Sequence, residues 1–323
     1  MISLYLQLNL FLGASWVVFQ LLPKKRMQYR AIKRIAQHLL LSSLIVIPVL
    51  TLLPDFSFPK RTSQVEGGQD IDSNFKAVSP IRNAVQRVAT VAEVAPQAAN
   101  FLPSFWPWMF LVGVLLMTIR RLTTWRRLHK LLQNTFSLHK IGYTSVVVSD
   151  AITVPFSALV GGRAYVVLPS ELVSFRKDFR IALRHEVEHH RQRDTLWAVA
   201  LEWLVCGFYL NPVVYLWRKT ILQLQELACD EALISRMRIS KQAYGSCLLR
   251  VAEMALERRF MCAGTTCMIP TSESNSHSFL KRRIIMFSQH ERSTVRKAAA
   301  LTLGTLAILI VIALAFVAQA AVR

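Results

Sequence analysis

Four stretches of this 323-residue chain are apolar, carry no charge and are long enough to cross a lipid bilayer. A membrane-spanning helix needs about 20 predominantly apolar residues. The competing interpretation, a helix buried in a protein core, is less typical of uncharged stretches this long. The sequence therefore predicts an α-helical integral membrane protein. The stretches are residues 3–22, 35–53, 101–119 and 298–321.

The composition points the same way. Hydrophobic residues make up 53% of the chain and charged residues 18%, whereas a soluble domain usually has about a quarter charged residues. The net charge of +20 indicates either nucleic acid or the cytoplasmic face of a membrane as a neighbour. Lys and Arg cluster beside the apolar stretches, so direct nucleic-acid binding is not expected. The five cysteines form no paired motif and are predicted to be free thiols in a reducing compartment.

The basic residues also predict an orientation. Residues 24–34 and 120–130 are rich in Lys and Arg without any acid, whereas residues 54–100 mix both signs. Because basic loops stay on the cytoplasmic side, both termini and the loop 54–100 are predicted outside. The predicted division is three transmembrane helices in 1–119, a cytoplasmic domain in 120–297 and a fourth transmembrane helix in 298–323.

The strongest chemical signal is HEVEH, at residues 185–189. His185 and His189 are four residues apart, so a helix presents both imidazoles on one face, where they can bind one Zn²⁺. Glu186 follows the first histidine and can take a proton from the attacking water, as in the H-E-x-x-H motif. The alternative is a solvated polar helix face, and Glu188 and His190 are assigned to it because they point off the ligand face.

A catalytic zinc site needs a third protein ligand on another element. Glu226 is the candidate, and Asp230 follows one helical turn later on the same side. Asp230 is predicted to accept the free N–H of a ligating histidine and so to select its tautomer. Glu231 is the nearest rival as the third ligand.

A fifth apolar run, residues 196–217, provides a topological test. If it crossed a membrane, His185 and Glu226 would lie on opposite faces and could not share an ion. The run contains Glu202, and Asn211–Pro212 would interrupt a helix. It is therefore predicted to be an interfacial or re-entrant helical hairpin that does not cross. Upstream, residues 143–149 and 163–168 are predicted to be strands.

Three segments resemble the membrane metallopeptidases related to the beta-lactam sensor-transducers of the BlaR/MecR type. They are HEVEHHRQRDTLW at 185–197, LNPVVYLWRK at 210–219 and ELACDEAL at 226–233. The resemblance covers nearly the whole chain and implies a gluzincin-like α+β peptidase domain, mostly helical with a small sheet, in a multi-pass bacterial inner-membrane protein. It also implies that His185, His189 and Glu226 are the zinc ligands and that Glu186 is the catalytic acid.

The resemblance further implies a function. The expected activity is zinc-dependent endoproteolysis on the cytoplasmic side, acting on a transcriptional repressor or on the chain itself. A quality-control or processing protease is the first alternative, and a non-enzymatic membrane adaptor with a degenerate site is the second. No penicillin-binding sensor domain follows the last apolar stretch, so direct beta-lactam sensing is not expected. Tyr244 or an arginine is the candidate for stabilising the oxyanion, and residues 163–168 are the candidate edge strand for binding substrate.

Overall fold

The computed structural model describes residues 2–24, 27–52, 106–262, 280–286, 302, 304–310 and 313. Predictions about the loop 54–100 and most of the last apolar stretch lie outside these residues. The chain divides into two compact units, one of residues 1–52 and 117–323 and the other of residues 53–116. The described part of the second unit, residues 106–116, is helical and forms the beginning of α4 (Trp106–Gln133).

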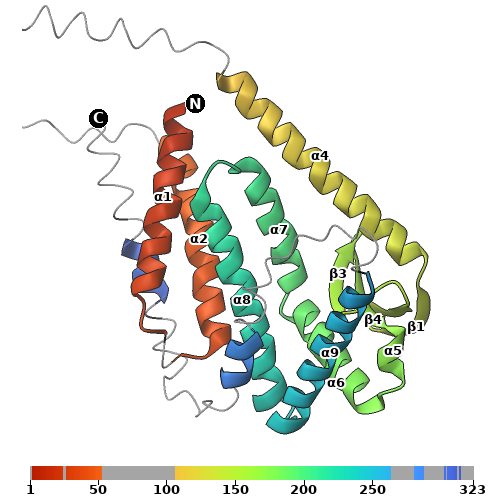
Figure 1. Cartoon of the computed structure of the whole chain (residues 1–323). Helices are drawn as coiled ribbons and strands as arrows, with labels where there is room; N and C mark the ends of the chain where they lie inside the picture. The colour runs from red at the N-terminus through yellow and green to blue at the C-terminus, as the bar shows by residue number, and fades with distance from the viewer. Residues whose placement is uncertain are drawn as a thin grey trace, which may run out of the picture. The chain divides into compact units, whose positions relative to one another are not determined.

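Four helices of the first unit pack side by side (Figure 1). They are α1 (Ile2–Leu21), α2 (Tyr29–Leu52), α7 (Asp194–Gly207) and α8 (Pro212–Ser235). Their shared core includes Leu12, Leu39, Leu201 and Trp217, all at most 1% exposed. The indole N–H of Trp217 donates to the carbonyl of Leu12 at 3.2 Å, so α8 is held to α1 by a buried hydrogen bond as well as by packing.

The prediction of an integral membrane protein is contradicted. Within the parts of the chain that the structure describes, no helix combines the length and the apolar character that a bilayer crossing requires. Two of the helices extend beyond the uncharged stretches of the sequence: α2 begins at Tyr29 and includes Arg30 and Lys33, and α4 continues through Arg120 and Arg121. The predicted multi-pass topology is therefore not supported.

The apolar run 196–217 is broken into two helices. Helix α7 ends at Gly207 and α8 begins at Pro212. Asn211 is the N-cap of α8, and its side-chain oxygen accepts the backbone N–H of Val213 at 2.8 Å. Proline is well tolerated at the first helical position, where its missing N–H has no partner to lose. Because the chain reverses here, α7 and α8 pack on each other and return Glu226 toward α6.

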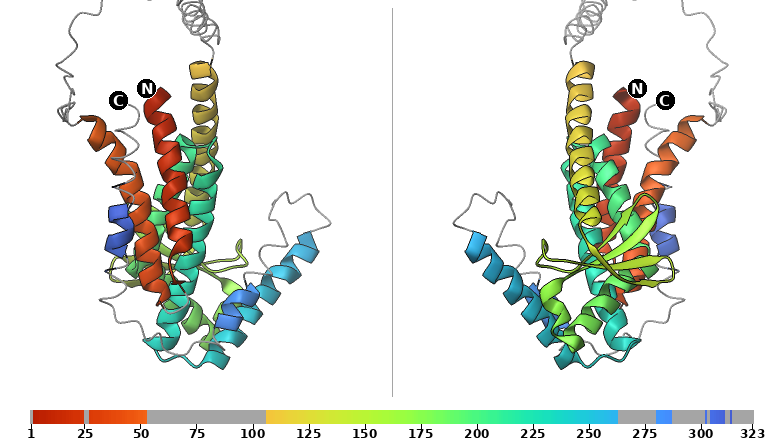
Figure 2. Two further views of the ribbon diagram at one scale, coloured as in Figure 1. Left: turned by 90° about the vertical axis from the view of Figure 1, so that its left-hand side faces the viewer. Right: turned by 90° about the vertical axis from the view of Figure 1, so that its right-hand side faces the viewer.

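A small sheet stands beside the helices, as Figure 2 shows. Its order is β1-β2-β4-β3; β2 and β4 are parallel, and the two outer pairs are antiparallel. Both strands expected from the sequence are confirmed, as β2 and β4, while β1 and β3 were not expected. The strands are β1 (Phe136–Ile141), β2 (Thr144–Ser149), β3 (Phe156–Val160) and β4 (Arg163–Pro169).

The edge strand next to the site is β3 rather than β4. Residues 163–168 were expected at the edge, but β4 pairs with β2 on one side and with β3 on the other. A two-residue loop, Gly161–Gly162, with φ of 58° and 75°, turns β3 back onto β4. Such positive φ values are typical of a type I′ hairpin and favour glycine. The tight hairpin therefore makes β3 the edge strand and β4 an inner strand. The residue pattern of β4 alone could not predict that another strand would pair with it.

Helix α6 (Arg176–Arg191) covers one face of the sheet and bears the HEVEH motif. Val146, Val166 and Leu168 of the sheet pack with Ala182 of α6, and the opposite face packs against Leu131 at the end of α4. The short helix α5 (Ser170–Val173) precedes α6, and α9 (Lys241–Cys262) packs against it. The sheet and α9 thus fix the position of α6 relative to α8.

Candidate metal centre

Helix α6 presents two histidines to one point. The Nε2 atoms of His185 and His189 lie 3.2 Å apart, and their rings meet edge to face at 88°. Both residues are buried. One turn separates them on the helix, which is the spacing at which side chains become neighbours.

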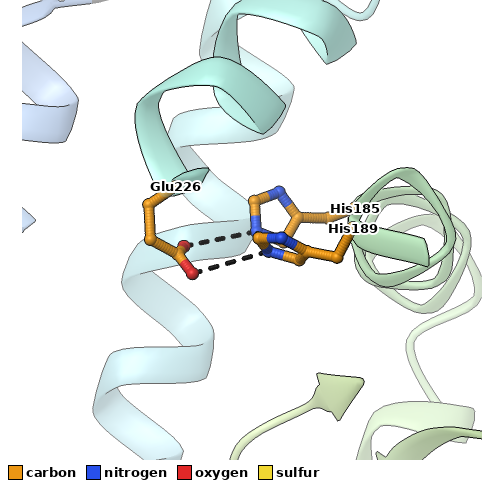
Figure 3. Close-up of side chains that lie close together, drawn as sticks. All are labelled: His185, His189 and Glu226. Atoms are coloured by element: carbon orange, nitrogen blue, oxygen red, sulfur yellow. Dashed lines mark hydrogen bonds and ion pairs between the residues drawn. The ribbon is translucent and has the colours of Figure 1, made fainter. Parts of the chain in front are cut away.

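Helix α8 brings the third candidate ligand to the same point. The Glu226 carboxylate places Oε2 at 3.4 Å from Nε2 of His185 and Oε1 at 3.5 Å from Nε2 of His189. Figure 3 shows both imidazoles projecting from one helix toward this carboxylate on another. The three donor groups form a cluster capable of holding a metal ion.

The separations within the cluster fit a zinc ion. Zinc binds histidine nitrogen and carboxylate oxygen at about 2.0–2.2 Å in a tetrahedral arrangement, which spaces ligand atoms about 3.3 Å apart. The observed separations of 3.2, 3.4 and 3.5 Å are close to that value. Two neutral nitrogens and one carboxylate are also the donors that a catalytic zinc site uses.

Glu231, the rival third ligand, points elsewhere. Its Oε2 accepts the backbone N–H of Arg30 at 3.4 Å, so the carboxylate faces the start of α2. Burial raises the pKa of Glu231. Of the two acids, the structure brings only Glu226 to the histidines.

A cavity of about 630 Å³ opens beside the cluster. Glu186, His189 and Glu226 contribute to its wall, together with residues of α4, β3, α7 and α8. Glu186 is itself only 7% exposed. The predicted catalytic acid, two of the predicted ligands and the edge strand β3 therefore share one hollow.

His189 has partners on its second ring nitrogen. Its Nδ1 lies 3.2 Å from Oδ2 of Asp194 and 3.4 Å from the sulfur of Cys229. Burial raises the pKa of the Cys229 thiol to about 12, so the thiol stays protonated and donates to Asp194. Sequence reasoning missed Asp194, although it stands five residues after His189 in the same motif.

The turn between α6 and α7 explains how Asp194 reaches His189. Arg193 adopts a left-handed conformation with φ of 60°, which ends α6 and directs the chain into α7 at Asp194. A residue in this conformation commonly terminates a helix. The reversal brings the first residue of α7 back alongside the last turn of α6, where His189 lies.

His185 is held differently from the prediction. Its Nδ1 lies 3.1 Å from the hydroxyl of Tyr244 and 3.7 Å from Oδ1 of Asp230. Tyr244 donates to Asp230 at 2.5 Å, so the tyrosine stands between the acid and the imidazole. Tyr244 thus contacts the ring nitrogen that faces away from Glu226. That position is unsuited to the oxyanion role for which Tyr244 was a candidate.

Arg283 contacts both Asp230, the acid behind His185, and Glu226, the third candidate ligand. It donates to both oxygens of Asp230, at 2.8 and 2.7 Å, and its remaining terminal nitrogen lies 3.1 Å from Oε2 of Glu226. Burial by itself would raise the pKa of Glu226, but the charge of Arg283 and the two imidazoles hold that pKa well below its ordinary value. The carboxylate is therefore ionised, as a metal ligand must be.

We expect Arg283→Met to destabilise the fold by about 3–5 kcal/mol, because it leaves the fully buried Asp230 without its cation. The free energy of unfolding in denaturant measures this loss. The matched control is Arg191→Met, since Arg191 is 53% exposed and lies 3.7 Å from Glu188; it should change stability by less than about 1 kcal/mol. Equal stability changes in the two variants would contradict the conclusion that Arg283 compensates the buried charge of Asp230.

Of the two residues that were assigned to a solvated face, Glu188 is buried and His190 is half-buried. Glu188 is 1% exposed and accepts a hydrogen bond from Gln192 at 3.0 Å. Nε2 of His190 lies 2.9 Å from the carbonyl of Tyr165, in the sheet. Both point off the ligand face, as expected, but the sheet and α8 surround α6 on more than one side.

The prediction of free thiols is confirmed for the three cysteines whose side chains are described, Cys206, Cys229 and Cys247.

Comparison with known proteins places the chain in a family. The family described as BlaR1 peptidase M56 matches the chain over residues 8–287. The protein named "Regulatory protein BlaR1" from Bacillus licheniformis is 28% identical over 125 residues, which are 38% of this chain and 20% of that protein. The match thus spans about a fifth of the relative's length. Peptidases of this family are typically metallopeptidases, and the family is membrane-associated. The chain belongs to the BlaR1 peptidase M56 family.

Proposed function

We propose that this protein is a zinc-dependent endopeptidase that acts in signal transduction by regulatory proteolysis. The observation that carries the proposal is the meeting of His185, His189 and Glu226 at the wall of a cavity that also contains Glu186. Membership of a peptidase family supports the reaction class. An adaptor with a degenerate site would not need to keep this donor set together.

Each residue has a definite part in the proposed reaction. Zinc held by His185, His189 and Glu226 would polarise the scissile carbonyl and make a water molecule more acidic. Glu186 accepts the proton of the attacking water and passes it to the leaving amine. Glu186 is buried in the wall of the cavity beside the ligand cluster.

The edge of the sheet supports a peptide as the substrate. Strand β3 lines the cavity and, among the strands of the described residues, pairs with β4 on one side only. An extended peptide binds such an edge as an additional strand, through backbone hydrogen bonds that do not depend on its sequence. This mode would lay the substrate backbone along the cavity beside Glu186 and the ligand cluster.

The proposed substrate is a transcriptional repressor or the chain itself. The support is the family and the name of the B. licheniformis relative, which describes a regulatory protein. Processing or quality control of membrane proteins would use the same chemistry, so the two functions differ in what is cut.

Mapping new protein N-termini in cells separates these functions. The cells would express wild type or Glu186→Gln at equal levels. We expect the wild type alone to produce a new N-terminus in a soluble DNA-binding protein or in this chain. New termini confined to membrane proteins would instead support the processing function. Identical N-termini in the two strains would contradict the proposal of a protease.

A further inference from the structure

A buried lysine from the N-terminal part of the chain reaches the metal centre. Nζ of Lys33, on α2, lies 2.7 Å from Oδ1 of Asp194 and 2.5 Å from Oε1 of Gln192. The side chains of Lys33 and Asp194 are each only 3% exposed. A lysine is rarely buried this deeply without a partner that compensates its charge.

The two oxygens of Asp194 have different partners. Oδ1 binds Lys33, and Oδ2 lies 3.2 Å from Nδ1 of His189. His189 presents its other nitrogen, Nε2, to Glu226 and His185. A histidine that binds metal through Nε2 must carry its proton on Nδ1, and an acceptor at Nδ1 selects that tautomer and orients the ring. The Asp194 carboxylate can do this only while it is held in place.

We propose that Lys33 is a positioning residue of the metal site, which acts on His189 through Asp194. The inference rests on the proposed metal site. Lys33 fixes the rotation of the Asp194 carboxylate, and the carboxylate fixes the tautomer and the plane of the imidazole. Lys33 stands more than 150 residues before the HEVEH motif, and through it helix α2 is then part of the metal centre. By linkage, a bound metal stabilises the docking of α2 to the same extent that docked α2 stabilises the metal.

A purely structural ion pair is the competing explanation. Lys33 would then only tie α2 to the corner between α6 and α7, and its loss would lower stability without changing the histidine. The chain offers a second ion pair between two helices for comparison, although its cation is more exposed than Lys33. Arg250 of α9 lies 2.7 Å from the Asp178 carboxylate of α6, the same separation, and Asp178 has no contact with either histidine among the contacts of the described residues.

The test measures Zn²⁺ affinity by competition with a chromogenic chelator, in full-length wild type, Lys33→Met and Arg250→Met. We expect Lys33→Met to raise the Kd for Zn²⁺ by about 10–100-fold, the usual effect of losing a partner behind a ligand. Arg250→Met should leave the Kd unchanged even where it lowers the thermal midpoint of the metal-free protein. The visible absorption of the Co²⁺-loaded protein should change in Lys33→Met only.

Two further variants complete the design. Lys33→Arg keeps the cation and should recover most of the Zn²⁺ affinity. Lys33→Gln keeps an N–H donor and serves where Lys33→Met does not fold; its Kd should fall between those of wild type and Lys33→Met. A folded Lys33→Met or Lys33→Gln variant with wild-type Kd and wild-type Co²⁺ absorption would overturn the inference and leave the proposed function intact. A folded wild type that binds no Zn²⁺ would overturn the proposed function, and the inference with it.

Discussion

His189→Ala should remove zinc from the purified protein, whereas the wild type should hold about one zinc ion per chain. The variant keeps only two of three donors, His185 and Glu226, at the cluster. Residues that only hydrogen-bond a metal ligand contribute about 10–100-fold to metal affinity. Loss of a ligand itself should therefore weaken zinc binding by more than about 100-fold. Metal analysis of the gel-filtered protein by atomic emission measures the content directly.

Glu226→Gln tests the third ligand in the same measurement. The amide has nearly the same shape as the carboxylate but lacks its charge, so zinc should again be lost. Glu231→Gln is the matched control, because Glu231 lies on the same helix with its carboxylate directed at the backbone of Arg30. Zinc kept in Glu226→Gln and lost in Glu231→Gln would show that the structure identifies the wrong acid.

Glu186→Gln should keep zinc and lose proteolysis. The amide cannot accept a proton, and general-base catalysis typically contributes about 10²–10⁴-fold to the rate. Glu186 is not among the three clustered donors, so metal content should stay at the wild-type level. Cleavage of an internally quenched peptide library, measured beside zinc content, separates the two effects.

Glu188→Gln is the control for this substitution. Glu188 belongs to the same helix and is also buried, but it binds Gln192, Arg191 and Arg236 and is not part of the cavity wall. A folded Glu188→Gln variant should cleave at the wild-type rate. The proposed mechanism would be wrong if Glu186→Gln cleaved the library as fast as the wild type does.

The sequence identified the residues that the structure brings together because their spacing is local. His185, Glu186 and His189 lie within five consecutive residues of one helix. The period of an α-helix therefore decides which of them share a face. Glu226 and Asp230 are related in the same way on α8. The break at Asn211 was also predictable from the chain, since the N-cap asparagine and the following proline act locally.

Long-range predictions were less successful. The membrane prediction counted uncharged residues along the chain, but helix boundaries are set by packing and include Arg30, Lys33 and Arg120. Strand β1 was missed because all six of its residues are exposed and its sequence has no buried face to reveal it. Strand β3 was missed because it is identified by its pairing with β4 rather than by its composition.

By itself, the sequence determined the two candidate histidine ligands and the candidate base, because they depend on residue type and short spacing. Glu226, far from the histidines along the chain, was selected by the type of ligand that zinc needs and by the family resemblance. Only the tertiary structure decided what holds those groups. Lys33 and Arg283 come from segments far from the motif, and each stands behind a buried aspartate that contacts the site. A buried charge needs a partner of opposite charge close to it. Which charged residues meet depends on how the helices pack, and a local sequence pattern does not predict that packing.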